Sequence, residues 1–209
     1  MILSTEPGAA AAVMLGLWMV GVTLVPTKLV IYGIQTLLLG MLAVSIGLRH
    51  HEIALVLAGS AVAVLKGGAV PIYLSFVARK IGCRRDEGVL IAPPLLLFLT
   101  VGALAALVLF RPFDDVLTAA ALPAIALIMI GMVLMVSRRL ALSQVLGFLV
   151  MENGMFLFTV AQPHAMPLVV ELGVLLDALV ATMLAGLLIF KIRDSFEHID
   201  VAELKRLRG

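Results

Sequence analysis

Three ionisable side chains lie deep inside apolar stretches of the chain. Lys66 follows the apolar run 61–65, Glu152 follows 147–151, and Asp177 lies about ten residues into the last apolar stretch. Each ionised group costs roughly 2.5–3.5 kcal/mol at the centre of a membrane helix, so such residues normally face a bundle interior, a partner subunit or a hydrated path. Titratable groups in a low-dielectric setting respond strongly to neighbouring charges. Their types and placement therefore indicate a proton pathway.

A second interpretation of the same residues stays open. One lysine and one carboxylate can form a structural ion pair that fixes the register of neighbouring helices. Since all three groups lie near mid-membrane, a lateral row of titratable groups is the interpretation we favour. Three nearby polar side chains are candidates to support it through hydrogen bonds within the bundle, although polar residues that merely pack helices are as common. They are Gln35, Gln144 and Asn153.

The residues after the lysine favour an irregular helix. Gly67 and Gly68 are followed by Pro71, and proline removes one hydrogen bond from a helix and pushes its ring against the preceding turn. These residues can loosen the helix beside Lys66 and leave backbone groups available to water. Close packing of another helix on the glycines explains them equally well.

The composition is that of a membrane protein. Hydrophobic residues make up 63% of the chain and charged residues 13%, with a mean hydropathy of +1.19; soluble domains are about half apolar and a quarter charged. The net charge of +2 gives no basic patch for nucleic acid. The single cysteine, Cys83, excludes a cysteine-ligated iron–sulfur or zinc centre built by this chain alone. With no phosphate-binding loop, GxSxG, HExxH or CxxC motif, we expect no catalytic centre here.

The apolar stretches predict an all-α integral membrane bundle of about seven helices. A span needs about 20 apolar residues, and because lipid offers no hydrogen bonds, a spanning segment must satisfy its own backbone groups as a helix. The first break is predicted at Pro26-Thr27-Lys28. The first stretch has no basic segment before it and no cleavage site, so we expect a retained helix rather than a signal peptide. The predicted spans are about 8–25, 29–48, 53–78, 89–110, 116–137, 140–161 and 167–190.

Basic residues alternate between the two sides. Twelve of the fifteen lie in the 26–28, 79–88 and 137–139 breaks and after residue 190, whereas the opposite breaks hold only Arg49 and Arg111. Positive loops stay in the cytoplasm. We therefore predict an N-terminus outside and a cytoplasmic C-terminus in a prokaryotic inner membrane, which requires an odd number of spans.

The chain also matches itself weakly at an offset of 111 residues. Lys28 then falls on Arg139, and Lys66 falls on Asp177. One membrane domain, 1–209, would contain repeat halves at about 1–88 and 116–209, joined by a helix at about 89–110. Such internal duplication is common among transporters and their relatives.

The segment Gly-Phe-Leu-Val-Met-Glu-Asn-Gly at 147–154 resembles the Met-Glu-Asn-Gly helix of the hydrogenase-4 component E family, a membrane subunit of formate-hydrogenlyase-type group 4 hydrogenases. The likeness runs over about 70 residues, from Ser137 through Glu152 and Asp177 to Arg193. The lysine–proline spacing of the 53–78 span looks similar too. The first span and the spans at 89–110 and 116–137 match only in length and hydropathy.

This family is similar in turn to the K subunit of respiratory complex I and the C subunit of multisubunit sodium/proton antiporters. K-type subunits carry two glutamates in consecutive helices along a central hydrophilic axis. Asp177 falls where the second would lie, whereas Leu149 occupies the place of the first and Glu152 follows three residues later. The resemblance thus implies a pathway role for Glu152 by analogy rather than by equivalence.

The resemblance implies a non-catalytic subunit that binds no cofactor, coupling electron transfer in a peripheral arm to proton translocation. Nickel–iron and iron–sulfur centres would belong to partner subunits. The implied partners are that arm, antiporter-like membrane subunits, a quinone-site-like membrane subunit and lipid. Two alternatives remain: a subunit of a cation/proton antiporter, and a structural scaffold of such a complex.

Overall fold

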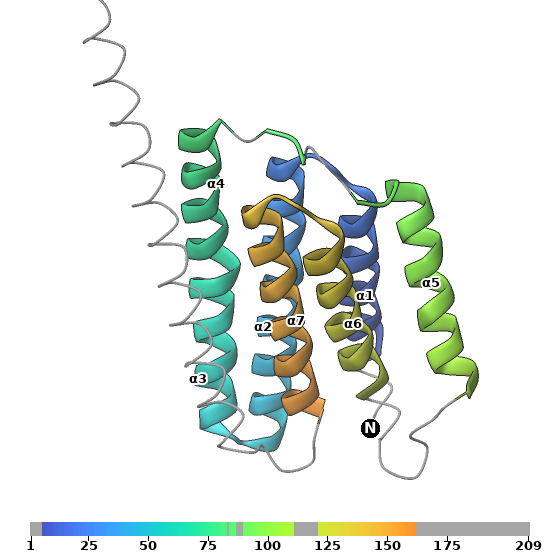
Figure 1. Ribbon diagram of the computed structural model, residues 1–209. Helices are drawn as coiled ribbons and strands as arrows, with labels where there is room; N and C mark the ends of the chain where they lie inside the picture. Colours follow the sequence, from blue (N-terminus) through green and yellow to red (C-terminus); the bar gives the residue numbers. More distant parts are fainter. Residues whose placement is uncertain (1–5, 83, 87–89, 111–120, 162–209) are drawn as a thin grey trace, which may run out of the picture. The chain divides into compact units, whose positions relative to one another are not determined.

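The computed structural model describes residues 6–82, 84–86, 90–110 and 121–161, and every structural statement below concerns these residues. They belong to one compact unit, Met1–Gly173, while a second unit, Val174–Gly209, lies outside the described part together with Asp177. Every regular element of the described residues is a helix (Figure 1). Its elements are α1 (Glu6–Gly21), α2 (Val25–His50), α3 (Ile53–Ala61), the π-helix η2 (Val62–Ala69), α4 (Val70–Ile81), α5 (Pro93–Phe110), α6 (Leu122–Ser137) and α7 (Ala141–Ala161).

These helices confirm the prediction of an all-α membrane bundle. Within the described residues, three helices are long and apolar enough to cross a membrane: α2, the continuous helix Ile53–Lys80 formed by α3, η2 and α4, and α7. Shorter apolar helices occupy Pro7–Gly21, Pro93–Leu109 and Leu122–Ser137. Six of the seven predicted spans are thus present as helices. The seventh, 167–190, lies outside the described residues.

The first predicted break is wrong by a few residues. α1 already ends at Gly21 and α2 begins at Val25, so Pro26 and Lys28 lie within the first turn of α2 rather than in a loop. Proline is accepted there because the first turn of a helix has no intrahelical partner for its N–H groups. Lys28 is therefore a helix residue, and its side chain is only 1% exposed.

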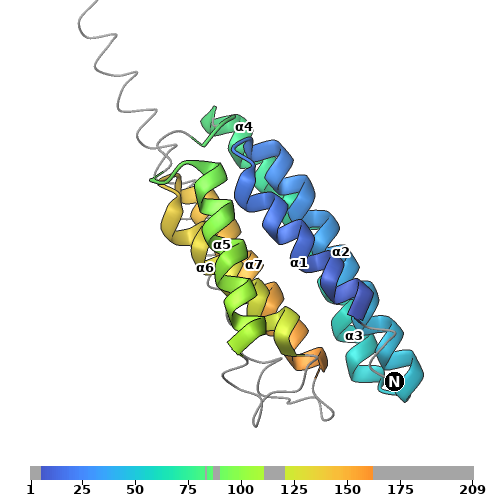
Figure 2. The same cartoon turned by 90° about the vertical axis from the view of Figure 1, so that its right-hand side faces the viewer.

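α2 is the element on which much of the bundle packs. It contacts α1, α7 and all three segments of the Ile53–Lys80 helix, while α6 packs on α1 and α7, and α5 on α1 and α6 (Figures 1 and 2). Glycines bring the backbones together: a Cβ at Gly40 would lie 2.8 Å from the carbonyl oxygen of Gly59, and one at Gly131 would lie 2.5 Å from the backbone nitrogen of Met151. Small residues let membrane helices approach this closely.

The helix around Lys66 is irregular, as the sequence predicted. Val62–Ala69 forms a π-helix, in which the N–H of Val70 donates to the carbonyl of Leu65, five residues back. Pro71 has no N–H to donate to Gly67, so the regular ladder cannot continue through this turn. Close packing of another helix on these glycines is also observed, because a Cβ at Gly67 would lie 2.9 Å from the side chain of Leu37 on α2. Whether water binds there stays a prediction.

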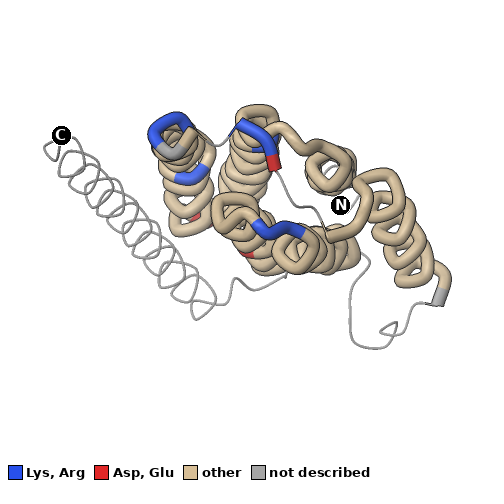
Figure 3. The backbone as a smooth tube through the Cα atoms, turned by 45° about the horizontal axis from the view of Figure 1, so that its top comes forward, with Lys and Arg blue, Asp and Glu red and all other residues tan. Residues whose placement is uncertain are grey.

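One end of the bundle carries most of the described basic side chains. At this basic end α1, α4 and α6 finish and α2, α5 and α7 begin, and Figure 3 brings it forward. Lys28 and Arg138 are buried there. The exposed basic residues of the same end are Arg79, Lys80, Arg84, Arg85 and Arg139.

Candidate functional site: two buried ionic groups

Lys66 and Glu152 form an ion pair in the middle of the bundle. The Nζ of Lys66 lies 2.8 Å from Oε1 of Glu152, with side chains 7% and 3% exposed. Lys66 comes from the π-helix of the Ile53–Lys80 span and Glu152 from α7, 86 positions apart in sequence. Two predicted pathway residues are therefore in direct contact. The third, Asp177, lies outside the described residues.

Asn153 joins α7 to α2 beside this pair. Its Nδ2 donates to Oγ1 of Thr36 at 2.8 Å and to Oε1 of Gln35 at 3.3 Å. Gln35 in turn donates from Nε2 to the carbonyl of Ala12 on α1, at 2.8 Å. These buried amides and the hydroxyl hydrogen-bond to one another, and Oδ1 of Asn153 is the atom of this group that has no partner within the described residues. The structure thus brings together Gln35 and Asn153, and adds Thr36, which the sequence did not single out.

Gln144 lies elsewhere. It is exposed at the start of α7, where its Nε2 donates to the carbonyl of Arg138 at 2.9 Å. That carbonyl lies just before the helix, so the contact stabilises the turn between α6 and α7. Among its described contacts, none reaches Glu152 or Asn153.

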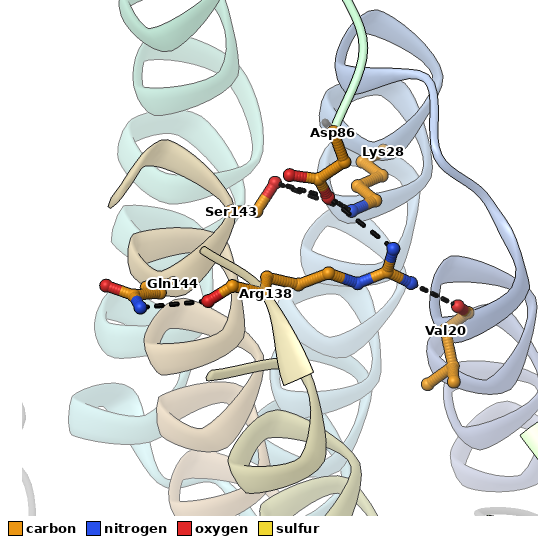
Figure 4. A network of polar contacts seen from close by, with 6 residues as sticks. All are labelled: Val20, Lys28, Asp86, Arg138, Ser143 and Gln144. Atoms are coloured by element: carbon orange, nitrogen blue, oxygen red, sulfur yellow. Dashed lines mark hydrogen bonds and ion pairs between the residues drawn. The ribbon is translucent and has the colours of Figure 1, made fainter. Parts of the chain in front are cut away.

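The basic end holds a second buried ionic group that sequence reasoning missed. Asp86, from the 82–92 loop, accepts from Lys28 at the start of α2 and from Oγ of Ser143 at 2.8 Å (Figure 4). The Nη1 of Arg138 lies 3.7 Å from Oδ2 of Asp86, and Nη2 donates to the carbonyl of Val20 at 2.5 Å. We call Lys28, Asp86, Arg138 and Ser143 the Asp86 cluster.

The Asp86 cluster holds two cations and one anion, each with a nearly inaccessible side chain. Burial lowers the pKa of the Arg138 guanidinium, and the carboxylate of Asp86 acts in the opposite direction. Arginine remains charged in proteins at any ordinary pH. The carboxylate of Asp86 lies between Lys28 and Arg138 and is the group that holds these two basic side chains together.

The spacing of polar residues in the sequence indicates the buried polar face of α2. Lys28, Tyr32, Gln35 and Thr36 are spaced at i, i+4, i+7 and i+8, which is one face of a helix, and all four are buried. The predicted break at Pro26-Thr27-Lys28 concealed this row. Asp86 lay unnoticed among basic loop residues, because nothing local marks a loop carboxylate as buried.

Within the part of the chain that the structure describes, no three His, Cys, Asp or Glu residues gather in a way that could hold a metal ion. The two ionic groups offer amine, guanidinium and carboxylate chemistry. Amines and carboxylates can bind and release protons, whereas the Arg138 guanidinium stays protonated.

Comparison with known proteins places these residues in a family. The family described as NADH-ubiquinone/plastoquinone oxidoreductase chain 4L matches residues 119–209, a region that includes Glu152 and Asp177. Hydrogenase-4 component E of Escherichia coli is 30% identical over 146 residues, covering 67% of each chain. The chain belongs to the hydrogenase-4 component E family. The resemblance found in its sequence is thereby confirmed.

Two further relatives extend the match. An uncharacterised protein of Mycobacterium tuberculosis is 32% identical over 168 residues, covering 78% of this chain and 76% of its own. Hydrogenase-4 component E of Shigella flexneri matches as the Escherichia coli protein does. No solved structure matches the chain. Membership of the component E family, related to chain 4L, makes this protein a membrane subunit of a multisubunit, complex I-like oxidoreductase assembly.

Proposed function

We propose that this chain is a proton-pathway subunit of a group 4 membrane-bound hydrogenase complex. The observation that carries the proposal is the buried contact between Lys66 and Glu152, 2.8 Å apart and supplied by two different membrane helices. Each residue is expensive to place in a membrane interior. The pair is therefore retained at an energetic cost, which a role in proton transfer would explain.

The geometry supports a simple exchange. With Lys66 protonated and Glu152 ionised, the pair is neutral. A proton arriving on Glu152 from a neighbouring titratable group removes the counter-charge that Glu152 gives Lys66, which favours release of a proton from the pair to the next group. The low dielectric of the bundle makes each such charge change strongly felt by its neighbour.

The remaining parts of the proposal come from the family. Asp177, on the seventh predicted span, would be the next titratable group, and antiporter-like and quinone-site-like membrane subunits would continue the path on either side. Electron transfer in a peripheral nickel–iron arm would drive it. The basic end would face the cytoplasm of a prokaryotic cell, with the N-terminus outside, because basic ends are retained inside.

Substitutions that remove a proton site while keeping its shape test the proposal. In the purified complex reconstituted into vesicles, we expect the assembled Glu152→Gln or Asp177→Asn complex to keep its electron transfer and to move fewer protons per electron. Gln144→Leu is a matched control, since Gln144 lies on the same helix but at its exposed end. Unchanged proton transport in both variants would contradict the pathway.

A structural scaffold is the second candidate, favoured by the fact that the ion pair cross-links two spans. In that case the same variants would reduce the amount of assembled complex, and the surviving complex would move protons normally. Gentle purification of the tagged chain tests the parent complex separately. Recovery of a nickel–iron large subunit is expected; sodium-dependent transport without any hydrogenase subunit would instead indicate the antiporter alternative.

A further inference from the structure

We propose that Asp86 is a positioning residue for the Lys66–Glu152 pair: the Asp86 cluster fixes α2 against α7 at the basic end and thereby aligns the pair in the middle of the bundle. The inference rests on the proposed function, because it concerns how that site is held. Asp86 itself does not touch the pair.

The Asp86 cluster ties five segments of the described chain together. The carboxylate comes from the 82–92 loop, Lys28 from the first turn of α2 and Ser143 from the first turn of α7. Arg138, between α6 and α7, reaches the carbonyl of Val20 in the last turn of α1. Lys28 and Ser143 are also within 3.4 Å of each other, so α2 and α7 are linked directly as well as through Asp86 (Figure 4).

The backbone holds the loop in place for this contact. The N–H of Asp86 donates to the carbonyl of Thr23 at 2.9 Å, and the N–H of Val25 donates to the carbonyl of Arg84 at 3.3 Å. On the other side, the N–H of Leu90 donates to the carbonyl of Ser137 at 3.2 Å. The loop is thus bound to both the α1–α2 turn and the end of α6, with the Asp86 carboxylate between them.

The same two helices, α2 and α7, continue from the Asp86 cluster to the middle of the bundle, where Thr36 and Glu152 lie. Along α2, Lys28 and Thr36 are eight residues apart, about 12 Å at 1.5 Å per residue; along α7, Ser143 and Glu152 are nine apart, about 14 Å. At this depth Asn153 on α7 donates a hydrogen bond to Thr36 on α2. α2 and α7 are therefore linked at two depths, and a change at the basic end alters how their middle segments are aligned with each other.

Lys66 follows α2 as well. The π-helix that carries it packs on α2 so closely that a Cβ at Gly67 would meet the Leu37 side chain at 2.9 Å, and Gly33 on α2 lies against the carbonyl of Gly67. Glu152 is on α7. A displacement of α2 relative to α7 therefore carries Lys66 away from its partner.

The charges identify Asp86 as the critical member. Without its carboxylate, Lys28 and Arg138 would be two buried cations facing each other, and their repulsion would separate the start of α2 from the α6–α7 turn. Within the described residues, Oδ1 of Asp86 and Nε of Arg138 have no hydrogen-bond partner. A buried ionic cluster that is incompletely satisfied is a poor source of stability, which leaves positioning as its better explanation.

The test is Asp86→Asn in the whole complex, with two measurements. The first is the number of protons moved per electron in vesicles. The second is the infrared pH titration of the Glu152 carboxyl band, assigned by its loss in Glu152→Gln. We expect Asp86→Asn to lower proton transport and to shift the Glu152 titration. Asp86→Glu, which keeps the charge, should restore both in large part, and Arg85→Ala, an exposed neighbour in the same loop, should change neither.

Should Asp86→Asn fail to assemble, Ser143→Ala replaces it. This variant removes the hydrogen bonds that Ser143 makes with Asp86 and Lys28 but keeps the Asp86 carboxylate, so it should shift the Glu152 titration in the same direction by a smaller amount. The inference is overturned if the assembled Asp86→Asn or Ser143→Ala complex shows wild-type proton transport and a wild-type Glu152 titration. It is distinguishable from failure of the proposed function, in which Glu152→Gln itself would leave proton transport unchanged.

Discussion

The two buried ionic groups of this bundle differ in charge, in depth and in the elements that supply them. The Lys66–Glu152 pair combines one cation and one anion from the middles of two spans, whereas the Asp86 cluster combines two cations and one anion from a loop and helix ends. Among the described residues, these two groups contain every buried charged side chain. The same apolar bundle thus accommodates charge in two ways.

The difference suggests different tasks. A neutral pair can gain or lose a proton and change its net charge by one in either direction, which suits proton exchange. In the Asp86 cluster one carboxylate lies between two basic side chains that come from different helix ends. The cluster is therefore suited to clamping helix ends, and the pair to exchanging protons. Three sets of substitutions test this contrast, from the largest expected effect to the smallest.

Removal of one member of the mid-bundle pair should have the largest effect on stability. Lys66→Ala or Glu152→Ala leaves a buried charge without its counter-charge, which costs about 3–5 kcal/mol. The paired substitution Lys66→Met with Glu152→Met should cost far less, because no orphaned charge remains. Thermal denaturation of the detergent-solubilised protein measures both. Equal losses in the single and paired variants would show that packing, and not charge, dominates at this site.

Adding a methyl group to α7 between the Asp86 cluster and the Lys66–Glu152 pair should lower the stability by an intermediate amount. Gly147 lies on α7 between Ser143 and Glu152, and its Cβ would lie 2.7 Å from the backbone nitrogen of Met135. Because backbone must move to admit it, we expect Gly147→Ala to cost about 1–3 kcal/mol of stability. Gly102→Ala on α5 is the matched control, since a Cβ there meets no atom within 4 Å. Equal melting temperatures for the two variants would contradict the close α6–α7 packing.

Loss of the neutral hydrogen bonds beside the pair should have the smallest measurable effect. Asn153→Leu removes the bonds to Thr36 and Gln35, and interhelical bonds in membrane proteins contribute about 0.6 kcal/mol on average and about 1.7 at most. Gln144→Leu should cost less, because that side chain is exposed and loses one hydrogen bond, to the carbonyl of Arg138. Chemical denaturation compares the two. A larger loss in Gln144→Leu would reverse the roles that the structure gives these amides.

The sequence was informative wherever charge interrupts an apolar run. Lys66 and Glu152 stood out because their neighbours are apolar, and the helices around them followed from length and hydropathy. The irregular turn was predictable from the glycines and Pro71. The contact between Lys66 and Glu152 was not, since periodicity gives the face of a helix but not the face of the partner it meets.

The Asp86 cluster shows the opposite case. Lys28, Asp86 and Arg138 lie at helix ends and in a loop, where charged residues are normally solvated, and only their convergence in three dimensions buries them. Under the weak repeat, Lys28 falls on Arg139, the neighbour of Arg138. The repeat hinted that these helix starts are alike but gave no reason to place Asp86 between them. The repeat itself, and the role of Asp177, stay predictions.

The most direct test of the central claim removes both charges of the pair at once. Lys66→Met with Glu152→Gln removes the cation and the anion together, so its effect on proton movement is separated from the cost of leaving one of these two charges without the other. The number of protons moved per electron is measured in vesicles containing the purified complex. We predict a complex that assembles and transfers electrons but moves fewer protons per electron than the wild type. An unchanged ratio would contradict the claim that Lys66 and Glu152 form part of the proton pathway.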